Sequence, residues 1–332
     1  MPTKSVARVY HGTPRNLARL ARRLRAGELV AVPTETVYGL AANAFDAAAC
    51  RKIFAAKGRP ATDPLIVHIH RWRDLAQVAE TNATAEKLAA KFWPGPLTLV
   101  LRKKSAVPEV VSAGLPSVAV RMPAHPLFRR LLRLTGLPLA APSANPFGYV
   151  SPTTAEHVRA GLGKKIRYIL DGGASPIGLE STIVDLRNPR KPRLLRPGAV
   201  THAALERALR AKVSRPHPTP RTGKSDAVQL APGMLARHYS PRAAVVLHQR
   251  IDAHGPLAAD EAWVFLARPA GRRGRNIFSL DPRGDLHGVA RRLFATLRRC
   301  DDGRFRKIHL ELAPGTGLAD AINDRLRRAA TR

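Results

Sequence analysis

The chain of 332 residues has few cysteines, few acidic residues and no long apolar run. Its two cysteines, Cys50 and Cys300, lie far apart without a CxxC pair, which excludes a disulfide framework and indicates a reducing compartment. No apolar stretch approaches the about 20 residues of a membrane-spanning helix. The N-terminal residues also lack the apolar core of a signal peptide. We therefore expect a cytoplasmic protein with no membrane partner.

The shortage of acidic residues leaves a large positive charge. There are 24 Asp and Glu residues against 56 Lys and Arg residues, a formal net charge of +32. Such a balance is typical of proteins that bind nucleic acid. However, both halves of the chain are comparably basic, and Arg outnumbers Lys about three to one, whereas nucleic-acid modules usually concentrate their charge on one face or tail. We interpret much of the excess as a chain-wide arginine bias, so charge alone does not indicate a function.

Apolar runs alternate with amphipathic stretches over residues 1–212, which predicts an α/β sheet covered by helices on both faces. The expected strands are 28–33, 65–69, 97–101, 118–122, 138–142, 167–171, 182–186 and 193–196. The expected helices are 14–26, 46–57, 84–92, 126–135, 154–162 and 201–212. The last two strands are too close in sequence for a helical crossover, so they should pair antiparallel and make the sheet mixed.

A proline-rich segment separates this region from a smaller one. Residues 213–241 contain five prolines and little periodicity, which is typical of a linker. Beyond it, strands are expected at 244–248, 262–267 and 307–312, and helices at 285–299 and 317–330. The predicted organisation is an α/β domain over 1–212, a linker or lid over 213–241, and a second α/β domain over 242–332.

Several familiar catalytic motifs do not apply. Thr222–Ser225 resembles the end of a phosphate-binding P-loop, but position 218 is proline where the motif needs glycine. Gly315–Gly317 begins like a dinucleotide fingerprint, but position 320 is aspartate, so we interpret it as a helix-opening turn. The HExxH zinc motif and the Gly-x-Ser-x-Gly elbow are also missing. The chemistry should therefore use neither metal hydrolysis nor a covalent serine.

Polar clusters lie near the predicted strand ends, where ligand sites form in α/β folds. They cover residues 33–40, 57–68, 142–145 and 178–182, with Ser117, Arg121 and Arg196 at or beside strands. Each cluster alone has a structural interpretation, such as a turn or a helix cap. Together, two cations around one glycine suit phosphate or carbonate oxygens, and Arg121 suits a small carboxylate. The set predicts a site for a nucleotide and a small anionic substrate.

These motifs, in this order, closely resemble the long, two-domain form of the YrdC-type threonylcarbamoyl-AMP synthases. The matching segments are PTETVYGL (33–40), KGRP (57–60), DPLIVHI (63–69), WPGPLTLVL (93–101), VAVRMPAHP (118–126), APSAN (141–145), LESTIVDL (179–186), RPGAV (196–200), PGMLARHYSP (232–241) and GTGLADAINDRLRRAA (315–330). The resemblance covers nearly the whole chain. It implies an open, twisted, mixed α/β sheet with a basic cavity, followed by a smaller Rossmann-like domain.

The resemblance also implies a reaction. Members of this family are nucleotidyltransferases that combine L-threonine, bicarbonate or CO2, and ATP into threonylcarbamoyl-AMP and release pyrophosphate. A downstream transferase complex moves the threonylcarbamoyl group to an adenosine beside the anticodon of tRNA. Mg²⁺ is expected on the ATP phosphates, with no ligand from a protein side chain. The sequence leaves open whether tRNA contacts this chain directly.

Residue roles follow from the match to the family motifs. Threonine is expected to contact Thr34, His68, Arg121, Ala141 and Ser181. ATP is expected to contact Lys57, Arg59, Ser117, Ser143, Asn145, Ser151, Arg196 and Tyr239, with Lys57 and Arg59 as the catalytic residues. The chain departs from the family pattern at Asp63, often Asn, and at Ser117, often Thr. Replacing Lys57 by alanine is expected to abolish activity and leave the fold intact.

Two further hypotheses rest on specific features. The net charge of +32 and the family's basic cavity motivate the alternative of a non-catalytic RNA-binding protein. Hydrogenase-maturation factors contain a YrdC-like domain too, but they carry paired CxxC sites that this chain lacks. Because carbamates decompose in water, an enclosed site would help the reaction, and the 213–241 linker is a candidate lid.

Overall fold

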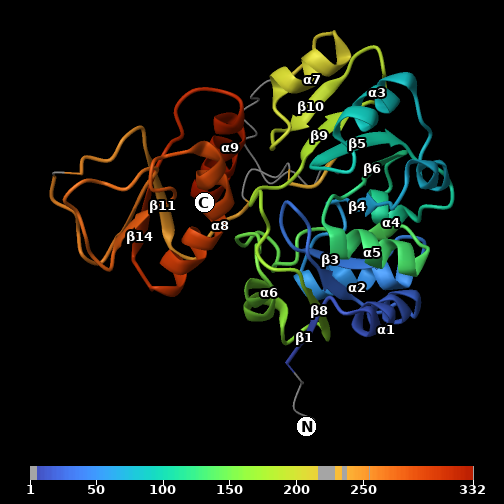
Figure 1. The fold of residues 1–332 in the computed structure, drawn as a ribbon, viewed down its shortest axis with the longest axis horizontal. Coiled ribbons are helices and arrows are strands. Elements are labelled where there is room, and N and C mark those ends of the chain that lie inside the picture. Colours follow the sequence, from blue (N-terminus) through green and yellow to red (C-terminus); the bar gives the residue numbers. More distant parts are fainter. Residues whose placement is uncertain (1–5, 216–228, 234–237, 254, 332) are drawn as a thin grey trace.

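A computed structural model describes residues 6–215, 229–233, 238–253 and 255–331. The P-loop-like segment Thr222–Ser225 lies outside the described residues. Two sheets organise the chain, in the order of elements that the sequence predicts (Figure 1). The fold is α/β with a mixed sheet and a second, parallel sheet, as predicted. Within the described ranges, no helix combines the length and the apolar character needed to cross a bilayer.

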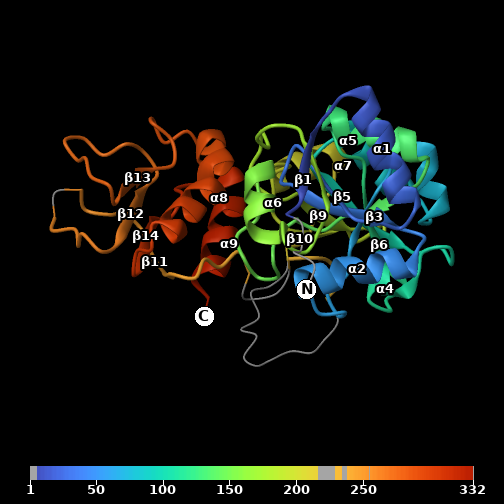
Figure 2. The ribbon, with the colours of Figure 1, turned by 90° about the horizontal axis from the view of Figure 1, so that it is seen from below.

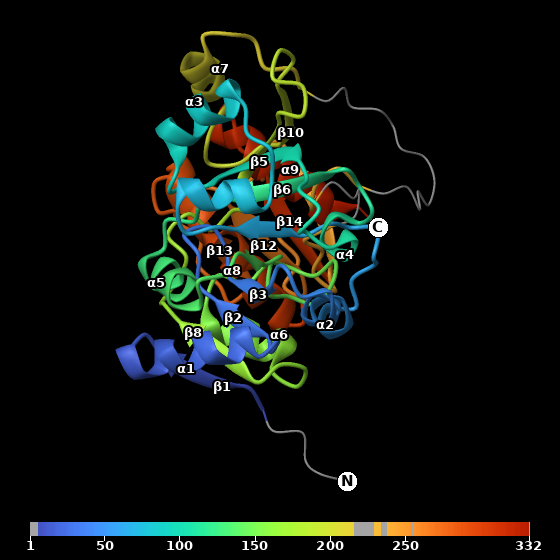
Figure 3. The same cartoon turned by 90° about the vertical axis from the view of Figure 1, so that its right-hand side faces the viewer.

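The first sheet has ten strands in the order β1-β8-β2-β3-β7-β4-β6-β5-β9-β10. Their bounds are β1 Arg8–His11, β2 Val30–Val32, β3 Gly39–Asn43, β4 Ile66–His68, β5 Leu97–Arg102, β6 Ser117–Arg121, β7 Leu139–Ala140, β8 Tyr168–Asp171, β9 Thr182–Asp185 and β10 Arg193–Arg196. Figure 3 shows these strands stacked from β10 at the top to β1 at the bottom. Strands β9 and β10 pair antiparallel, so the prediction of a mixed sheet is confirmed.

Helices cover both faces of this sheet. They are α1 Pro14–Arg25, α2 Ala47–Lys57, α3 Ala83–Phe92, α4 Glu109–Ser112, α5 Pro126–Thr135, α6 Ala155–Leu162 and α7 His202–Leu209, with a 3-10 helix η1 at Trp72–Gln77. Because side chains alternate along a strand, Val30 and Val32 of β2 pack with α1 and α5, whereas Ala31 faces the core that contains α2, α3, α6 and α7. The two cores fix the sheet between two helical layers.

The end of helix α2 matters for the site. Asp46 caps its N-terminus by accepting hydrogen bonds from the backbone N–H groups of Ala48 and Ala49. Gly58 ends it in the left-handed conformation, with φ of +66°, which glycine adopts without steric cost. The chain therefore turns sharply between Lys57 and Arg59, and both side chains are buried.

The second sheet has four parallel strands in the order β11-β14-β12-β13. Its elements are β11 Ala244–His248, β12 Ala262–Phe265, β13 Ile277–Ser279, α8 Leu286–Asp302, β14 Lys307–Glu311 and α9 Leu318–Ala330. Helices α8 and α9 lie between this sheet and the first domain (Figures 1 and 2). Apolar residues of the first domain, including Val37, Val150 and Leu179, join the core of the second. The second domain's apolar core thus extends into the first domain.

The sequence missed some short elements. Strand β3 lies where the sequence predicts a polar loop, because its residues, Gly39–Asn43, are mostly small. Strands β1 and β13, helix α4 and helix η1 were not predicted, and each is six residues or shorter. Gly317 begins helix α9, so the helix-opening turn expected there is confirmed. We keep 1–212, 213–241 and 242–332 as the proposed domain division.

Candidate active site

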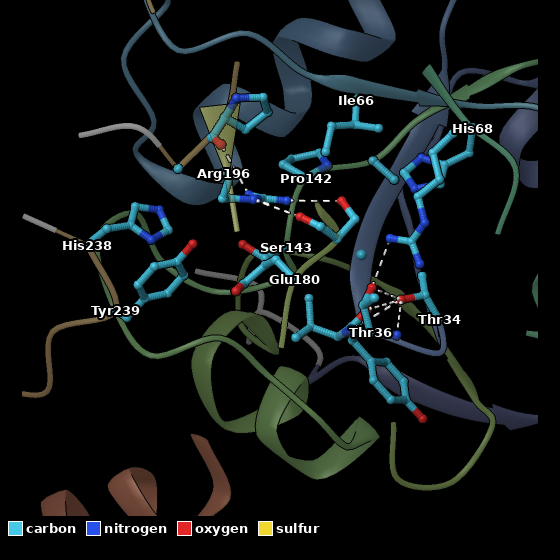
Figure 4. A pocket seen from close by; sticks show the side chains of 18 of the residues that line it. Thr34, Thr36, Ile66, His68, Pro142, Ser143, Glu180, Arg196, His238 and Tyr239 are labelled. Carbon is cyan, nitrogen blue, oxygen red and sulfur yellow. Dashed lines mark hydrogen bonds between the residues drawn. The ribbon is translucent and has the colours of Figure 1, made fainter. Parts of the chain in front are cut away.

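A cavity lies over the middle of the first sheet (Figure 4). Strands β4 and β6 contribute His68 and Arg121 to its wall. Gly39 of β3, Ile66 of β4 and Arg196 of β10 also line it, and loops at strand ends contribute the rest of the first-domain wall. The lining residues are Thr34, Thr36, Val37, Tyr38, Gly39, Arg59, Ile66, His68, Arg121, Ala141, Pro142, Ser143, Glu180, Ser181, Arg196, Pro232, Gly233, His238 and Tyr239. The site therefore forms at strand ends, as α/β sites generally do.

Most residues predicted for the site line this cavity. They are Thr34, Arg59, His68, Arg121, Ala141, Ser143, Ser181, Arg196 and Tyr239. The other predicted residues, Lys57, Ser117, Asn145 and Ser151, are not in its lining and are almost fully buried. In Figure 4, Thr34, Thr36 and His68 lie at one end, and His238 and Tyr239 lie at the other, with Ser143, Glu180 and Arg196 between them. We name these two ends the threonine end and the nucleotide end after the roles predicted from the sequence. They meet where Arg196 donates to the Ser181 hydroxyl at 3.1 Å.

At the threonine end, hydrogen bonds hold Arg121 in place. Its guanidinium donates to the Thr36 hydroxyl at 2.9 Å and to the Gly95 carbonyl at 3.2 Å, and it pairs with the Glu35 carboxylate at 2.6 Å. The Thr34 hydroxyl oxygen accepts from the N–H groups of Thr36 and Val37 at 3.1 and 3.2 Å, which fixes the loop. This end therefore presents a preorganised cation beside hydroxyl groups.

Two more groups complete the threonine end. The ring of His68 packs on Phe128 with centroids 5.3 Å apart. Burial, and then the charge of Arg121, lower the pKa of His68 to about 3, so its imidazole is neutral near pH 7. The Ser181 hydroxyl shares a hydrogen bond of 2.7 Å with the Thr98 hydroxyl. A small polar substrate would meet neutral donors and acceptors around one cation.

At the nucleotide end, buried cations are bonded mainly to backbone carbonyls. Lys57 Nζ donates to the carbonyls of Ser143 at 2.6 Å and Asn145 at 2.5 Å. Arg196 donates to the carbonyls of Ser181 at 3.0 Å and Pro232 at 3.1 Å. Burial lowers the pKa of both side chains, and neighbouring Arg59 adds to this effect at Lys57. Such cations are poised to gain from an incoming anion.

Arg59 differs because it has a carboxylate partner. It pairs with Asp63 at 2.9 Å and donates to the Asp63 and Pro64 carbonyls at 3.0 and 2.7 Å. Asp63, where the family often has asparagine, therefore supplies a buried counter-charge. Ser117, the other departure, is buried, and among the described residues its hydroxyl has no hydrogen-bond partner.

The burial of Lys57 revises one expectation. Its side chain is 3% exposed, and its ammonium satisfies two buried carbonyls. Alanine at this position would leave those carbonyls without a donor, which costs about 1–3 kcal/mol for each unsatisfied group. The contacts of Lys57 therefore predict a loss of stability in Lys57→Ala, in place of the intact fold expected from the sequence.

The described parts of the linker close one side of the cavity. Pro232 accepts from Arg196, and Tyr239 is fully buried with its ring stacked on Phe294 of α8, centroids 5.4 Å apart. Gly233 has φ of +76°, and a Cβ there would lie 2.9 Å from Arg196 Nη1 and 3.0 Å from the Tyr239 hydroxyl. Only glycine fits that approach. The His238 pKa is held well below its ordinary value by burial and by Arg59, Lys57 and Arg196.

Some lining residues had no role in the sequence prediction. Thr36 and Glu180 lie within the motifs PTETVYGL and LESTIVDL, but the sequence predicts no ligand contact for either residue. Glu180 carried a usable signal, because it is a lone acidic residue directly before a buried strand in a chain short of acids. Among the residues described, no group of three or more His, Cys, Asp and Glu side chains is arranged to hold a metal ion. The cavity's cations therefore point to anionic ligands.

Sequence comparisons identify relatives over the whole chain. A family model described as "Telomere recombination" matches residues 22–198, and one described as "Threonylcarbamoyl-AMP synthase, C-terminal domain" matches residues 200–331. The threonylcarbamoyl-AMP synthase of Pyrococcus abyssi is 43% identical over 320 residues, which cover 92% of each chain. That of Bacillus subtilis is 41% identical over 335 residues, which cover 95% of this chain and 92% of the relative.

Solved structures agree with these relatives. The crystal structure of P. abyssi Sua5 complexed with L-threonine superposes with a TM-score of 0.88 at 38% identity, covering 98% of both chains. A variant of that protein with a histidine and the next residue, a tyrosine, changed to alanine gives 0.86 at 36% identity, covering 98% of this chain and 96% of that one. Escherichia coli YciO shares the fold, with a TM-score of 0.53 at 21% identity over 58% of this chain and 96% of its own. The chain is an enzyme of the nucleotidyltransferase class, and it belongs to the threonylcarbamoyl-AMP synthase family.

Proposed function

We propose that the chain condenses L-threonine, bicarbonate or CO2, and ATP in this cavity, forming threonylcarbamoyl-AMP and pyrophosphate. One observation carries the proposal. Two buried arginines line one cavity: Arg121, which is bonded to the Thr36 hydroxyl and paired with Glu35, and Arg196, which is bonded to backbone carbonyls. The buried ammonium of Lys57 lies behind the wall, on the carbonyl of cavity-lining Ser143. A carboxylate and a triphosphate are the two anions that such an arrangement suits. The archaeal relative whose structure contains L-threonine supports the first of these.

At the threonine end, the substrate carboxylate would pair with the Arg121 guanidinium. Glu35 and Gly95 hold that guanidinium in one orientation, so binding costs little reorganisation. The hydroxyl groups of Thr34 and Ser181 and the neutral imidazole of His68 would orient the rest of the molecule. Ala141 forms part of the wall.

At the nucleotide end, the phosphates would pair with Lys57, Arg59 and Arg196. These groups would exchange backbone carbonyls for phosphate oxygens, which are stronger partners for a cation. Ser143 lines the cavity, whereas Lys57, Ser117, Asn145 and Ser151 lie behind its wall. The last four would contact ATP only after the wall opens, or they support the groups that do.

The chemistry needs positioning more than a nucleophile from the protein. The neutral amine of threonine attacks CO2 and loses a proton, giving a carbamate. One carbamate oxygen then attacks the α-phosphorus of ATP, and the bond to the pyrophosphate oxygen breaks. Buried cations would stabilise the charge that moves onto the phosphates. Lys57 and Arg59 are the proposed catalytic residues.

Mg²⁺ would enter with ATP and neutralise phosphate charge. The donor set fits this arrangement, because the carboxylates nearest the cavity, Glu35, Asp63 and Glu180, are each committed to an arginine. The protein's own contribution is then to hold the phosphates through Lys57, Arg59 and Arg196. This cofactor assignment stays a prediction.

The linker would enclose the reactants. Pro232, Gly233, His238 and Tyr239 already line the cavity, and 238–239 is the one place in the chain where a tyrosine directly follows a histidine. A variant of the archaeal relative alters such a pair. Enclosure would protect the carbamate from water. We propose that this segment acts as the lid, with Tyr239 over the nucleotide.

The product would pass to a transferase complex that modifies adenosine in tRNA. That destination and a cytoplasmic location stay predictions, and direct contact of this chain with tRNA stays an open question. The alternative of a non-catalytic RNA-binding protein predicts tight tRNA binding at physiological salt without turnover.

Pyrophosphate release tests the proposal. The full chain should release pyrophosphate only when threonine, bicarbonate, ATP and Mg²⁺ are all present. Release at an equal rate without threonine would contradict the proposal, as would tight tRNA binding with no release at all.

A further inference from the structure

The C-terminal domain places a fully buried arginine behind the cavity wall. Arg325 lies on α9, and its side chain is 0% exposed although helix α9 belongs to the second domain. Its Nε donates to Glu180 Oε2 at 2.8 Å, and its Nη1 donates to Asp324 Oδ2 at 2.8 Å. Glu180 itself lines the cavity. An interdomain ion pair therefore fixes a carboxylate of the site.

Glu180 also bonds Ser151, a residue predicted to contact ATP. Its other oxygen, Oε1, accepts a hydrogen bond of 2.5 Å from the Ser151 hydroxyl. Arg298 of α8 donates to the backbone carbonyl of Ser151 at 3.4 Å and to that of Val150. Two arginines of the C-terminal domain thus hold the 150–151 segment and Glu180 together.

Arg325 also backs the linker tyrosine. Its guanidinium carbon lies 5.4 Å from the centroid of the Tyr239 ring, a cation–π arrangement. The ring of Phe294 of α8 also stacks on the Tyr239 ring. The side chain that we assign to the lid is therefore supported by both helices of the second domain.

The charge balance explains why the constraint matters. A buried carboxylate without its partner is unfavourable and moves to the nearest cation or takes up a proton. Glu180 and Arg196 line the same cavity, and Arg196 is the cation assigned to the phosphates. Without Arg325, Glu180 would compete with the nucleotide for Arg196.

We propose that Arg325 is a positioning residue of the active site, through which the C-terminal domain holds Glu180 away from Arg196 and supports Tyr239. This inference rests on the proposed function, because it takes the cavity as the place where ATP binds. It gives the second domain a defined role, which is to complete the wall of a site that the first domain carries.

A charge-removal cycle on the full chain tests this inference. The proteins are the wild type, Arg325→Met, Glu180→Gln and the double variant, with Arg327→Met as the matched control on the exposed face of α9. We expect Arg325→Met to raise the KM for ATP by about 10- to 100-fold, the range typical when a group that orients a functional residue is lost. The KM for threonine should change less, because the Glu180 carboxylate is freed at the nucleotide end.

The double variant shows whether the freed charge of Glu180 causes the loss of ATP affinity. Removing the Glu180 charge in the Arg325→Met background should restore most of the lost ATP affinity, and Arg325→Lys should retain part of it. Arg327→Met should match the wild type. If the Arg325→Met chain folds and the double variant is equally impaired or worse, Arg325 acts through packing alone and the inference is overturned. An unchanged KM for ATP in Arg325→Met overturns it as well.

A binding measurement separates this inference from the proposed function. Calorimetric titration of Mg²⁺-ATP reports the same four-protein cycle without turnover. The wild type could release no pyrophosphate while ATP affinity falls in Arg325→Met and recovers in the double variant. That result would contradict the proposed reaction and support the positioning role of Arg325. The wild type could instead release pyrophosphate as proposed while the titrations show no coupling between positions 325 and 180. That result would support the proposed reaction and contradict the positioning role of Arg325.

Discussion

The two sheets differ in the partners of some of their buried charges, although the first domain also contains the buried pairs Arg59–Asp63 and Arg121–Glu35. In the first domain, Lys57 and Arg196 are buried against backbone carbonyls. In the second domain, buried carboxylates have partners of their own, because Glu261 pairs with His309 at 2.8 Å and Glu311 accepts from the N–H groups of Ile251 and Leu266. Parallel sheets commonly bind ligands at their carboxyl ends, but here Glu311, at the carboxyl end of β14, is bonded to backbone N–H groups of its own domain. This difference supports the proposal that ligands bind in the first domain and that the second domain supports the site.

The largest expected effect tests the cavity cations. Arg196→Met should lower kcat/KM for ATP by about 100- to 1000-fold, because it removes a preorganised charge from a buried site. Arg193, on the same strand with a side chain that is 41% exposed, provides the matched control. Arg193→Met should keep near-normal kinetics of pyrophosphate release. Equal losses in the two variants would show that strand β10, rather than the buried charge, matters.

Lys57 links the site to the stability of the first domain. Lys57→Ala should lower the free energy of unfolding by about 2–4 kcal/mol, since two buried carbonyls lose their donor. Lys52, on the same helix, donates from the surface to the Gly27 carbonyl at 2.7 Å, so Lys52→Ala should cost less. Urea unfolding measures both. A stable but inactive Lys57→Ala chain would mean that the lysine is free for ligand and not part of the framework.

The buried imidazole at the threonine end predicts a pH dependence of stability. His68 has a pKa of about 3 when folded and 6.5 when unfolded, so the unfolded chain binds more protons between these values. Stability should therefore fall as the pH decreases through this window, by about 1.4 kcal/mol per pH unit from this group. His68→Gln should reduce the slope, and His11→Gln, at a side chain 82% exposed, should not. An unchanged slope in His68→Gln would contradict the buried, neutral assignment.

The smallest effect on activity is expected in the second sheet. Glu261→Gln breaks the pair with His309 and should lower the urea midpoint. Its kcat/KM should stay within about twofold of the wild type, because distant sites act independently. A large kinetic loss with an unchanged midpoint would place a functional site at this sheet edge.

Local pattern predicted the fold well where elements were long or capped. Helix α1 begins at Pro14 after its Thr13 cap, and helix α5 spans Pro126–Thr135 as expected. Short strands such as β1 and β3 are not predicted by local pattern, because β1 pairs with β8 and β3 pairs on one side with β7, and both partners lie far away in sequence.

The order of the motifs predicted which residues form the candidate site, but it did not predict how those residues contact one another. It brought Thr34, Arg121 and Arg196 to one cavity, although these residues come from distant segments. It did not reveal that Lys57 is bonded to carbonyls, or that Glu180 is held by Arg325 from the other domain. Those contacts join residues that neither spacing nor composition relates.

Isotope labelling of the product tests the central claim most directly. The wild-type chain is supplied with ¹³C-bicarbonate, ¹⁵N-threonine and ATP, and the products are identified by mass spectrometry. We predict one adenylate that carries both labels, formed together with pyrophosphate, and its loss in Arg196→Met but not in Arg193→Met. An adenylate that lacks either label, or no adenylate from a folded chain, would contradict the claim that three substrates meet in this cavity.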